Sequence, residues 1–294
     1  MIKLNGHVVL PTIFPDGTSQ VWKIKDYILK PGHHCTPMQK VEWWFENESE
    51  LFHLAQLKML LDKNGRVNTE LYMPYCPYAR QDKDISDEQT FALNTFLGIL
   101  KGMHWSLIST INMHNIDFVA KFDFNWRNNK KTPEVGHYDT VIFPDAGAAT
   151  RYNIKHSNIA IGSKVRDQDT GWITHYELEG KVWGNVIVVD DLCDGGKTFE
   201  LLAQSIFDPT RNYPNIERLD LSITHGIFSK GLDKLMRWYN TIFTTNSFFG
   251  HTVQSGPYMV DNLGRAAMSD DPRCAWYANL WKYTQQQRLV VEGV

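Results

Sequence analysis

Apolar residues gather along the chain in short runs, and longer amphipathic stretches separate these runs. The runs are rich in Val, Ile, Thr and aromatic residues, as is typical of buried strands. They cover residues 71–73, 105–110, 140–143, 159–161, 186–189, 219–224 and 241–244. Strands that alternate with helices predict mostly parallel sheets flanked by helices, an α/β fold.

Several of the amphipathic stretches have a clear helical face. One helix is predicted from about residue 48 to 61, with Leu51, Leu54, Ala55 and Met59 on one side. Another is predicted to begin at Ser86, because 86–89 (SDEQ) has the pattern of a capping box. Its buried side carries Leu93, Phe96, Leu97 and Leu100. A third helix is expected from about Thr198, and a fourth in the stretch from Arg273.

The polar segment 125–136 (NWRNNKKTPEVG) is the best boundary between domains. It divides the chain into residues 1–130 and 131–294, and each half has its own series of strands and helices. In sheets of this kind ligands bind at the carboxyl ends of the strands. The residues that follow each strand are therefore the first candidates for a functional site.

Composition narrows the class of protein. The 294 residues are 43% hydrophobic and 21% charged with a net charge of −3, so neither a disordered chain nor a basic nucleic-acid or membrane-surface binder is expected. No run approaches the ~18 apolar residues of a membrane helix, and the N-terminus lacks a signal-peptide core. The four cysteines have no paired spacing, which fits a reducing compartment, and a cytoplasmic protein is predicted.

The most informative segment is 186–198 (VIVVDDLCDGGKT). A buried strand is followed by Asp190 and Asp191, and a glycine-rich turn then opens a helix. Exposed amides at a helix N-terminus bind anions, and the two carboxylates suit sugar hydroxyls or Mg²⁺. A P-loop is rejected, because Asp191 stands where its first glycine should be. An ordinary solvated turn remains the alternative reading of these residues alone.

This segment resembles the phosphoribosyl-diphosphate (PRPP) motif of type I phosphoribosyltransferases and PRPP synthetases. Further segments resemble the synthetases specifically, in the family's order from about residue 10 to 250. They are 14–17 (FPDG), 72–83 (YMPYCPYARQDK), 112–114 (NMH), 143–147 (FPDAG), 164–166 (KVR) and 224–229 (THGIFS). The resemblance implies two tandem phosphoribosyltransferase-like domains, 1–130 on the ATP side and 131–294 with the ribose-phosphate loop. The C-terminal helix would pack on the core, on the first domain or on another subunit.

The resemblance also implies an activity: Mg²⁺-dependent transfer of the β,γ-diphosphate of ATP to the anomeric hydroxyl of a ribose phosphate, with release of AMP. Phe14 and Asp16 would contact adenine in a neighbouring subunit, which implies a homo-oligomer, a dimer or a hexamer. Arg80 and Gln81 would hold the ATP phosphates, and His114 would bind the ATP-associated Mg²⁺ and take part in catalysis.

On the acceptor side, the resemblance gives Lys164 and Arg166 a catalytic role. Both would come from a mobile loop, continuing to about residue 171, that closes over the transition state. Asp145 would orient the ribose or bind a second Mg²⁺, and Asp190 and Asp191 would hold the ribose hydroxyls. The phosphate loop would consist of Asp194, Gly195, Gly196, Lys197 and Thr198.

Two positions depart from the family. Asn112 replaces the acid of the family's D-L-H, and 194–198 reads DGGKT where the family has D-T-x-G-T. Gly195 lacks a hydroxyl donor and is expected to open space, while Lys197 adds a cation. An acceptor with an extended 5′-diphosphate fits these changes, as in phage-type relatives that rebuild NAD⁺ by converting ADP-ribose to ADP-ribose 1″-pyrophosphate. Ribose 5-phosphate and ADP-ribose are equally weighted.

Two other classes of protein stay open. A phosphoribosyltransferase would consume PRPP, but the ARQD and KVR segments argue against it. A non-catalytic regulatory homologue of the synthetases would be expected to lose catalytic charges, whereas Arg80, His114, Lys164 and Arg166 are all present.

Overall fold

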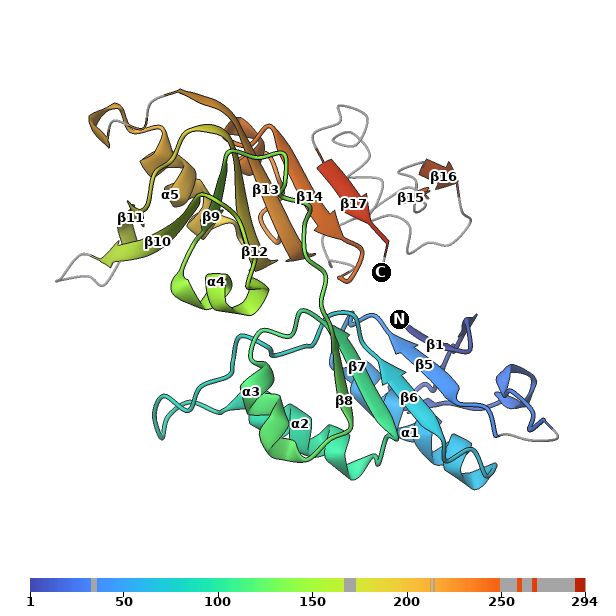
Figure 1. Cartoon of the computed structure of the whole chain (residues 1–294). Coiled ribbons are helices and arrows are strands. Elements are labelled where there is room, and N and C mark those ends of the chain that lie inside the picture. The colour runs from blue at the N-terminus through green and yellow to red at the C-terminus, as the bar shows by residue number, and fades with distance from the viewer. Residues whose placement is uncertain are drawn as a thin grey trace. The chain divides into compact units, whose positions relative to one another are not determined.

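The computed structural model describes residues 1–32, 36–166, 173–211, 213, 215–248, 258–260, 266–268 and 289–293, with the backbone alone for Arg166, Ile173, Arg211 and the strands beyond residue 248. The chain forms two compact units, Met1–Lys130 and Lys131–Val294 (Figure 1). Within the described residues, no helix has both the length and the apolar character that crossing a membrane requires. The predicted C-terminal helix from Arg273 lies outside the described residues.

The first unit is built on a six-stranded sheet of order β2-β1-β5-β6-β7-β8, in which β5 to β8 are parallel and β1 is antiparallel to both of its neighbours. The strands are β1 (Ile2–Leu4), β2 (His7–Val8), β5 (Gln39–Trp43), β6 (Thr69–Tyr72), β7 (Leu107–Ile111) and β8 (Trp126–Asn129). A separate hairpin pairs β3 (Thr12–Ile13) with β4 (Ser19–Gln20). The helices are α1 (Ser49–Lys63), α2 (Ala92–Gly102) and α3 (Ile116–Val119), with 3₁₀ turns η1 (Lys25–Tyr27) and η2 (Ala120–Phe122).

The second unit contains a seven-stranded sheet of order β11-β10-β9-β12-β13-β14-β17, parallel except for β11. Its strands are β9 (Thr140–Phe143), β10 (Ile159–Arg166), β11 (Ile173–Glu179), β12 (Gly184–Cys193), β13 (Ile216–Gly226), β14 (Thr241–Thr245) and β17 (Leu289–Glu292). A small hairpin joins β15 (Tyr258–Val260) and β16 (Ala266–Met268). The helices are α4 (Ala146–Tyr152) and α5 (Lys197–Ile206), with 3₁₀ turns η3 (Pro209–Arg211) and η4 (Leu235–Arg237).

The central strand β12 shows why its sequence is a continuous apolar run. Val186 and Val188 belong to the core that also contains residues of α5, whereas Ile187 and Val189 belong to the core that contains residues of α4. Successive side chains of a strand point to opposite faces, so a strand covered on both faces needs apolar residues at every position. The predicted α/β class with mostly parallel sheets is confirmed.

Every predicted strand is present, and the helix predicted over 48–61 is found as α1. The start predicted at Ser86 is wrong: 86–89 form a turn, with Gln89 N bonded to Ser86 O, and α2 begins only at Ala92. Residues 84–90 offer only one large apolar side chain, Ile85, and it is 70% exposed, so an earlier helical turn would have had nothing to bury. The predicted buried side of α2 is confirmed.

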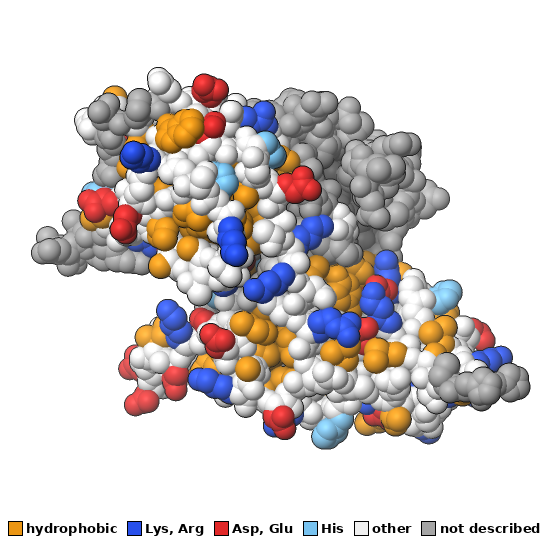
Figure 2. All heavy atoms as spheres, in the orientation of Figure 1, with side chains coloured by type: hydrophobic (Ala, Val, Ile, Leu, Met, Phe, Trp, Pro, Cys, Tyr) orange, Lys and Arg blue, Asp and Glu red, His pale blue; other side chains and the backbone are white. Residues whose placement is uncertain are grey.

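The polar segment 125–136 is not entirely a connection, because its first part forms β8. Trp126 pairs in register with Ile108 of β7 and donates its Nε1–H to Thr110 Oγ1 over 3.1 Å. Tertiary pairing has therefore ordered a polar stretch that has no hydrophobic run of its own. Figure 2 shows acidic and basic side chains interspersed over the viewed face of each unit, as the near-balanced net charge implies.

Candidate active site

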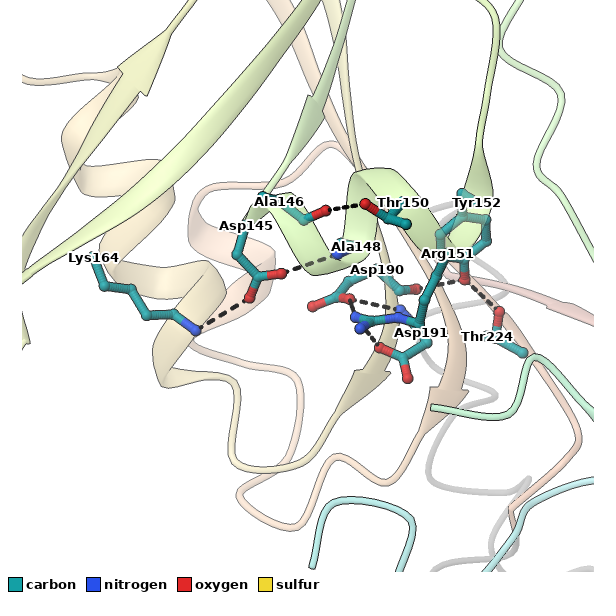
Figure 3. A network of polar contacts seen from close by, with 10 residues as sticks. All are labelled: Asp145, Ala146, Ala148, Thr150, Arg151, Tyr152, Lys164, Asp190, Asp191 and Thr224. Atoms are coloured by element: carbon teal, nitrogen blue, oxygen red, sulfur yellow. Dashed lines mark hydrogen bonds and ion pairs between the residues drawn. The ribbon is translucent and has the colours of Figure 1, made fainter. Parts of the chain in front are cut away.

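A pair of carboxylates lies at the carboxyl end of β12 and is bridged by one guanidinium (Figure 3). Arg151 Nη2 lies 2.9 Å from Asp191 Oδ1 and 3.1 Å from Asp190 Oδ1. Arg151 comes from α4, whose apolar side packs on the same sheet, and both carboxylates are buried. Two adjacent buried acids repel each other, so the guanidinium is what makes their close approach tolerable.

Each charged group of this cluster changes the pKa of its neighbours. Burial, followed by the neighbouring Asp191 carboxylate, raises the pKa of Asp190 well above its ordinary value. Burial alone would lower the pKa of Arg151, but Asp191, Asp190 and Asp145 outweigh it, so the pKa is raised and the guanidinium stays charged. The ionised form of Asp190 is therefore disfavoured at this position, and hydrogen-bond donors placed beside it would favour that form.

A third carboxylate, that of Asp145, begins α4. Its Oδ1 accepts a hydrogen bond from Ala148 N over 2.9 Å and caps the helix, and its Oδ2 lies 3.4 Å from Lys164 Nζ. Burial would raise the pKa of Asp145, but the Ala148 amide, Lys164 and Arg151 lower it below the ordinary value. Asp145 is therefore an ionised, partly exposed acceptor beside the acid pair.

A buried hydroxyl network supports the acid pair from β13. Tyr152 OH lies 2.9 Å from the Asp190 carbonyl oxygen and 2.7 Å from Thr224 Oγ1. The next residue, His225, is 3% exposed, and its Nδ1 lies 2.7 Å from Ser247 Oγ. The bond from Tyr152 therefore fixes the backbone at Asp190.

The predicted phosphate loop turns directly from β12 into α5. Gly196 is the N-cap of α5 and has φ +78°, a left-handed conformation that favours glycine. Ser229 Oγ donates to Asp194 Oδ1 over 2.5 Å, and Lys197 Nζ lies 3.4 Å from Glu200 Oε2. The open space expected over Gly195 is not there: the aliphatic part of Lys230 lies against this residue.

Lys164 lies on β10, so the prediction that it belongs to a loop is wrong. The antiparallel ribbon of β10 and β11 pairs Lys164 with Tyr176 and, after an irregularity, Arg166 with Ile173. The strand predicted over residues 159–161 is longer in the structure, because β10 continues to Arg166. The remainder of the predicted loop, residues 167–171, lies outside the described residues.

In the first unit, a hydrogen bond joins the two segments predicted to bind ATP, 72–83 and 112–114 with the residue that follows. Asn115 Nδ2 donates to Asp82 Oδ2 over 2.8 Å, which joins the residues after His114 to those after Gln81. Arg80 and Gln81 are exposed, and His114 is half-buried. The two segments follow neighbouring parallel strands, β6 and β7, which explains their proximity.

Phe14 and Asp16 lie on the turn between β3 and β4. Asp16 accepts bonds from Thr18 N and Thr18 Oγ1 at 2.9 and 2.7 Å, and these bonds lower the pKa of Asp16. Gln56 Oε1 of α1 accepts a hydrogen bond from Val21 N, the residue directly after β4, over 2.8 Å. Phe14 is thus an aromatic side chain, 37% exposed, on an anchored turn.

The fit of a metal ion can be judged from the donors. Among the described residues, no group of three or more His, Cys, Asp or Glu side chains is arranged to hold a metal ion. Mg²⁺ is usually bound by one or two carboxylates together with substrate phosphates and water. Single carboxylates and His114 therefore fit an ion that a phosphorylated ligand brings with it.

A cavity of ≈390 Å³ in the second unit is lined by other residues. Its lining includes Thr224, Lys131, His137 and Thr245. None of the predicted site residues lines it. The acid pair and the adjacent loop therefore form the candidate site on the grounds of their chemistry, not of their concavity.

Arg151 is the functional residue that the sequence interpretation missed. It follows Asp145 by six positions in 145–151 (DAGAATR). The sequence did indicate that some cation is needed, because two adjacent acids at the end of a buried strand require one. Which of the many basic residues supplies it depends on how α4 packs against β12.

The chain matches no model of a protein family. It is similar to the ribose-phosphate pyrophosphokinase of Thermococcus kodakarensis, with 23% identity over 252 residues, 80% of this chain and 83% of the relative. The enzyme of Pyrococcus furiosus is 22% identical over 249 residues, 80% of this chain and 84% of the relative. That of Streptomyces avermitilis is 28% identical over 211 residues, 67% of this chain and 61% of the relative.

Among solved structures, the phosphoribosylpyrophosphate synthetase of Mycobacterium smegmatis superposes with a TM-score of 0.66 at 16% identity, covering 97% of this chain and 86% of the other. The fold is thus that of this synthetase. In sequence, the chain is a distant homologue of ribose-phosphate pyrophosphokinases.

Proposed function

We propose that this protein is an enzyme that transfers the β,γ-diphosphate of ATP to the anomeric C1 hydroxyl of a ribose phosphate and releases AMP. One observation carries the proposal: Arg151 bridges Asp190 and Asp191 at the end of β12, and a glycine-rich turn into α5 follows at once. Similarity to ribose-phosphate pyrophosphokinases over 80% of the chain supports it.

The second unit would bind the acceptor. Asp190 and Asp191 would accept hydrogen bonds from the ribose hydroxyls, and the amides of 194–198 with the Thr198 hydroxyl would hold the 5′-phosphate at the start of α5. The carboxylates are already oriented by Arg151, so little rearrangement is needed when the sugar binds.

The remaining residues would handle the nucleotide and the transferred group. Phe14 and Asp16 would contact adenine, and the tandem Arg80 and Gln81 would hold the phosphates. In-line transfer between oxygens depends on positioning and on neutralising charge, which Lys164 and Arg166 would supply to the developing transition state. Adenine contact from a neighbouring copy would make the enzyme a homo-oligomer.

Mg²⁺ fits this proposal as a companion of ATP. His114 would hold the ion that accompanies ATP, with the nucleotide's phosphates supplying most of the ligands, and Asp145 would orient the ribose or hold a second Mg²⁺. When bound, it would neutralise phosphate charge and orient the β-phosphate. The protein's own contribution is to place the C1 hydroxyl and to keep water from competing for the diphosphate.

Two acceptors are retained in the proposal, ribose 5-phosphate and ADP-ribose, because the loop 194–198 carries an extra lysine and lacks a hydroxyl. The test is to incubate the protein with ATP, Mg²⁺ and each acceptor separately and to measure AMP. Release with ribose 5-phosphate alone excludes the extended acceptor, and release with ADP-ribose alone excludes PRPP synthesis. No release with either would refute the proposed activity and favour a regulatory homologue. Consumption of PRPP with a nucleobase, without ATP, would identify a phosphoribosyltransferase.

A further inference from the structure

The loop that follows β13 is fastened to the loop that follows β12. Ile227 N and Phe228 N both donate to Cys193 O, over 2.9 and 3.2 Å. Ser229 Oγ donates to Asp194 Oδ1 over 2.5 Å, so side chains join the two loops as well. Hydrogen bonds therefore hold the two loops, residues 193–197 and 227–231, against each other.

Lys230 has its stem seated on Gly195. A Cβ atom at position 195 would lie 3.3 Å from Lys230 Cδ, 3.4 Å from Cε and 3.7 Å from Cγ. Contacts near 3.3 Å are tighter than ordinary packing, so a larger side chain at this position would push the lysine away. The φ of Gly195 lies outside the left-handed region, so the glycine serves this close approach rather than the backbone conformation.

The position of Lys230 adds charge where a phosphate is expected. Lys230 is exposed, and within the described part of the chain its ammonium makes no hydrogen bond or ion pair, whereas Lys197 has Glu200 as a neighbour at 3.4 Å. The loop amides and Thr198 already provide donors for an anion at the start of α5. A lysine held over the first residue of this turn adds a donor that can approach the same ligand from the other loop.

We propose that Gly195 and Lys230 act as a pair, in which the missing side chain seats the lysine and the lysine ammonium binds a phosphoryl group on the 5′ side of the acceptor sugar. This inference rests on the proposed function, because it takes the acceptor to bind at this loop. It makes Lys230 a specificity-determining residue that stands 35 positions from the glycine it contacts.

The test measures binding separately from turnover. Ribose 5-phosphate and ADP-ribose are titrated calorimetrically, without ATP, into the wild type, Lys230→Met and Gly195→Val. Methionine keeps most of the stem and removes the charge, and valine displaces the stem without adding a hydrogen-bond donor. Lys181→Met removes a charge from the connection that precedes β12, at the opposite edge of the sheet, and is the matched control.

Lys230→Met is expected to weaken acceptor binding about tenfold, which corresponds to the loss of one charge-assisted contact of ~1.4 kcal/mol. Gly195→Val should cause a similar loss, and the double variant should lose little more than either single one, because both remove the same contact. Lys181→Met should bind like the wild type. A loss for both acceptors places the ammonium on the first phosphate, and a loss for ADP-ribose alone places it on the second.

Wild-type affinity in Lys230→Met for every acceptor that binds would overturn the inference, as would a wild type that binds neither acceptor. Additive losses in the double variant would overturn the pairing of the two residues. AMP release is assayed in parallel on the same samples. If Lys230→Met weakens binding while the wild type releases no AMP, the proposed reaction fails and the phosphate contact stands.

Discussion

Arg151 Nη2 lies 2.9 Å from the Asp191 carboxylate, and this contact lets two adjacent acids occupy the end of a buried strand. The same nitrogen reaches Asp190 at 3.1 Å, so a single guanidinium serves both. Under the proposed function, the hydroxyl donors of the acceptor sugar would bond to the carboxylate oxygens without displacing the cation.

Replacing Arg151 by Gln should destabilise the protein by about 3 kcal/mol, since it leaves two buried carboxylates without their cation. Urea unfolding at neutral pH measures the loss. The destabilisation should shrink at low pH, where the acids become protonated in the variant. Arg151→Lys keeps the charge but loses the planar guanidinium. Its free energy of unfolding should lie between those of the wild type and Arg151→Gln. An unchanged free energy of unfolding for Arg151→Gln would contradict the role assigned to the bridge.

Asp190→Asn should stabilise the protein and abolish turnover. The folded-state pKa of Asp190 is raised, so the folded protein holds this proton more tightly than the unfolded chain does. As the pH rises from the ordinary pKa of an aspartate toward the raised pKa, ionisation of Asp190 therefore lowers the free energy of unfolding. Asparagine does not ionise, so the variant avoids this loss. The melting temperature at pH 7 should rise by about 2–4 °C for each kcal/mol gained, and the gain should disappear at acidic pH. The exposed Asp233→Asn is the control, and a lower melting temperature for Asp190→Asn would refute the prediction.

Lys164→Ala should slow AMP release by roughly 100-fold, because removal of one preorganised donor to the transition state costs about 3 kcal/mol. Stability should hardly change, since the ion pair with Asp145 joins partly exposed groups and such pairs contribute little. Turnover and thermal unfolding are measured on the same preparation. Near-normal turnover would remove Lys164 from the catalytic residues.

Asn115→Ala should act on ATP and not on the acceptor. It removes the bond to Asp82 that joins the two segments proposed to bind the nucleotide. The loss of about 1 kcal/mol corresponds to roughly a fivefold higher KM for ATP. The acceptor KM should stay unchanged, and Thr95→Ala, on the exposed side of α2, should affect neither value. An equal rise in both KM values would indicate general damage instead of a loosened nucleotide site.

Removal of divalent metal should stop the reaction without unfolding the protein. A chelator is expected to abolish AMP release, because the proposed reaction uses Mg²⁺ bound with ATP. The melting temperature of the nucleotide-free protein should not move, since the described residues contain no cluster of three metal-ligating side chains. A fall of several degrees would reveal a structural metal site.

Short sequence patterns correctly predicted those strands and helices whose formation depends on neighbouring residues. The runs at 140–143 and 241–244 are strands because β-branched and apolar residues favour a buried strand at each position. The start of α2 was predicted wrongly from a capping pattern at Ser86, because a cap stabilises a helix only where a buried face continues through it. Strand β8 was missed because its order depends on pairing with β7.

The sequence alone determined the class of fold and the order of the motifs at the strand ends, since each of these follows from neighbouring residues and from the shared edge of parallel strands. Only the tertiary structure decided which cation meets the acid pair and what lies against Gly195. Arg151 is separated from Asp190 and Asp191 by 39 and 40 positions, and Lys230 contacts Gly195 from another loop. Such contacts depend on how helices and loops pack against the sheet, and side-chain spacing along one segment carries no record of that packing.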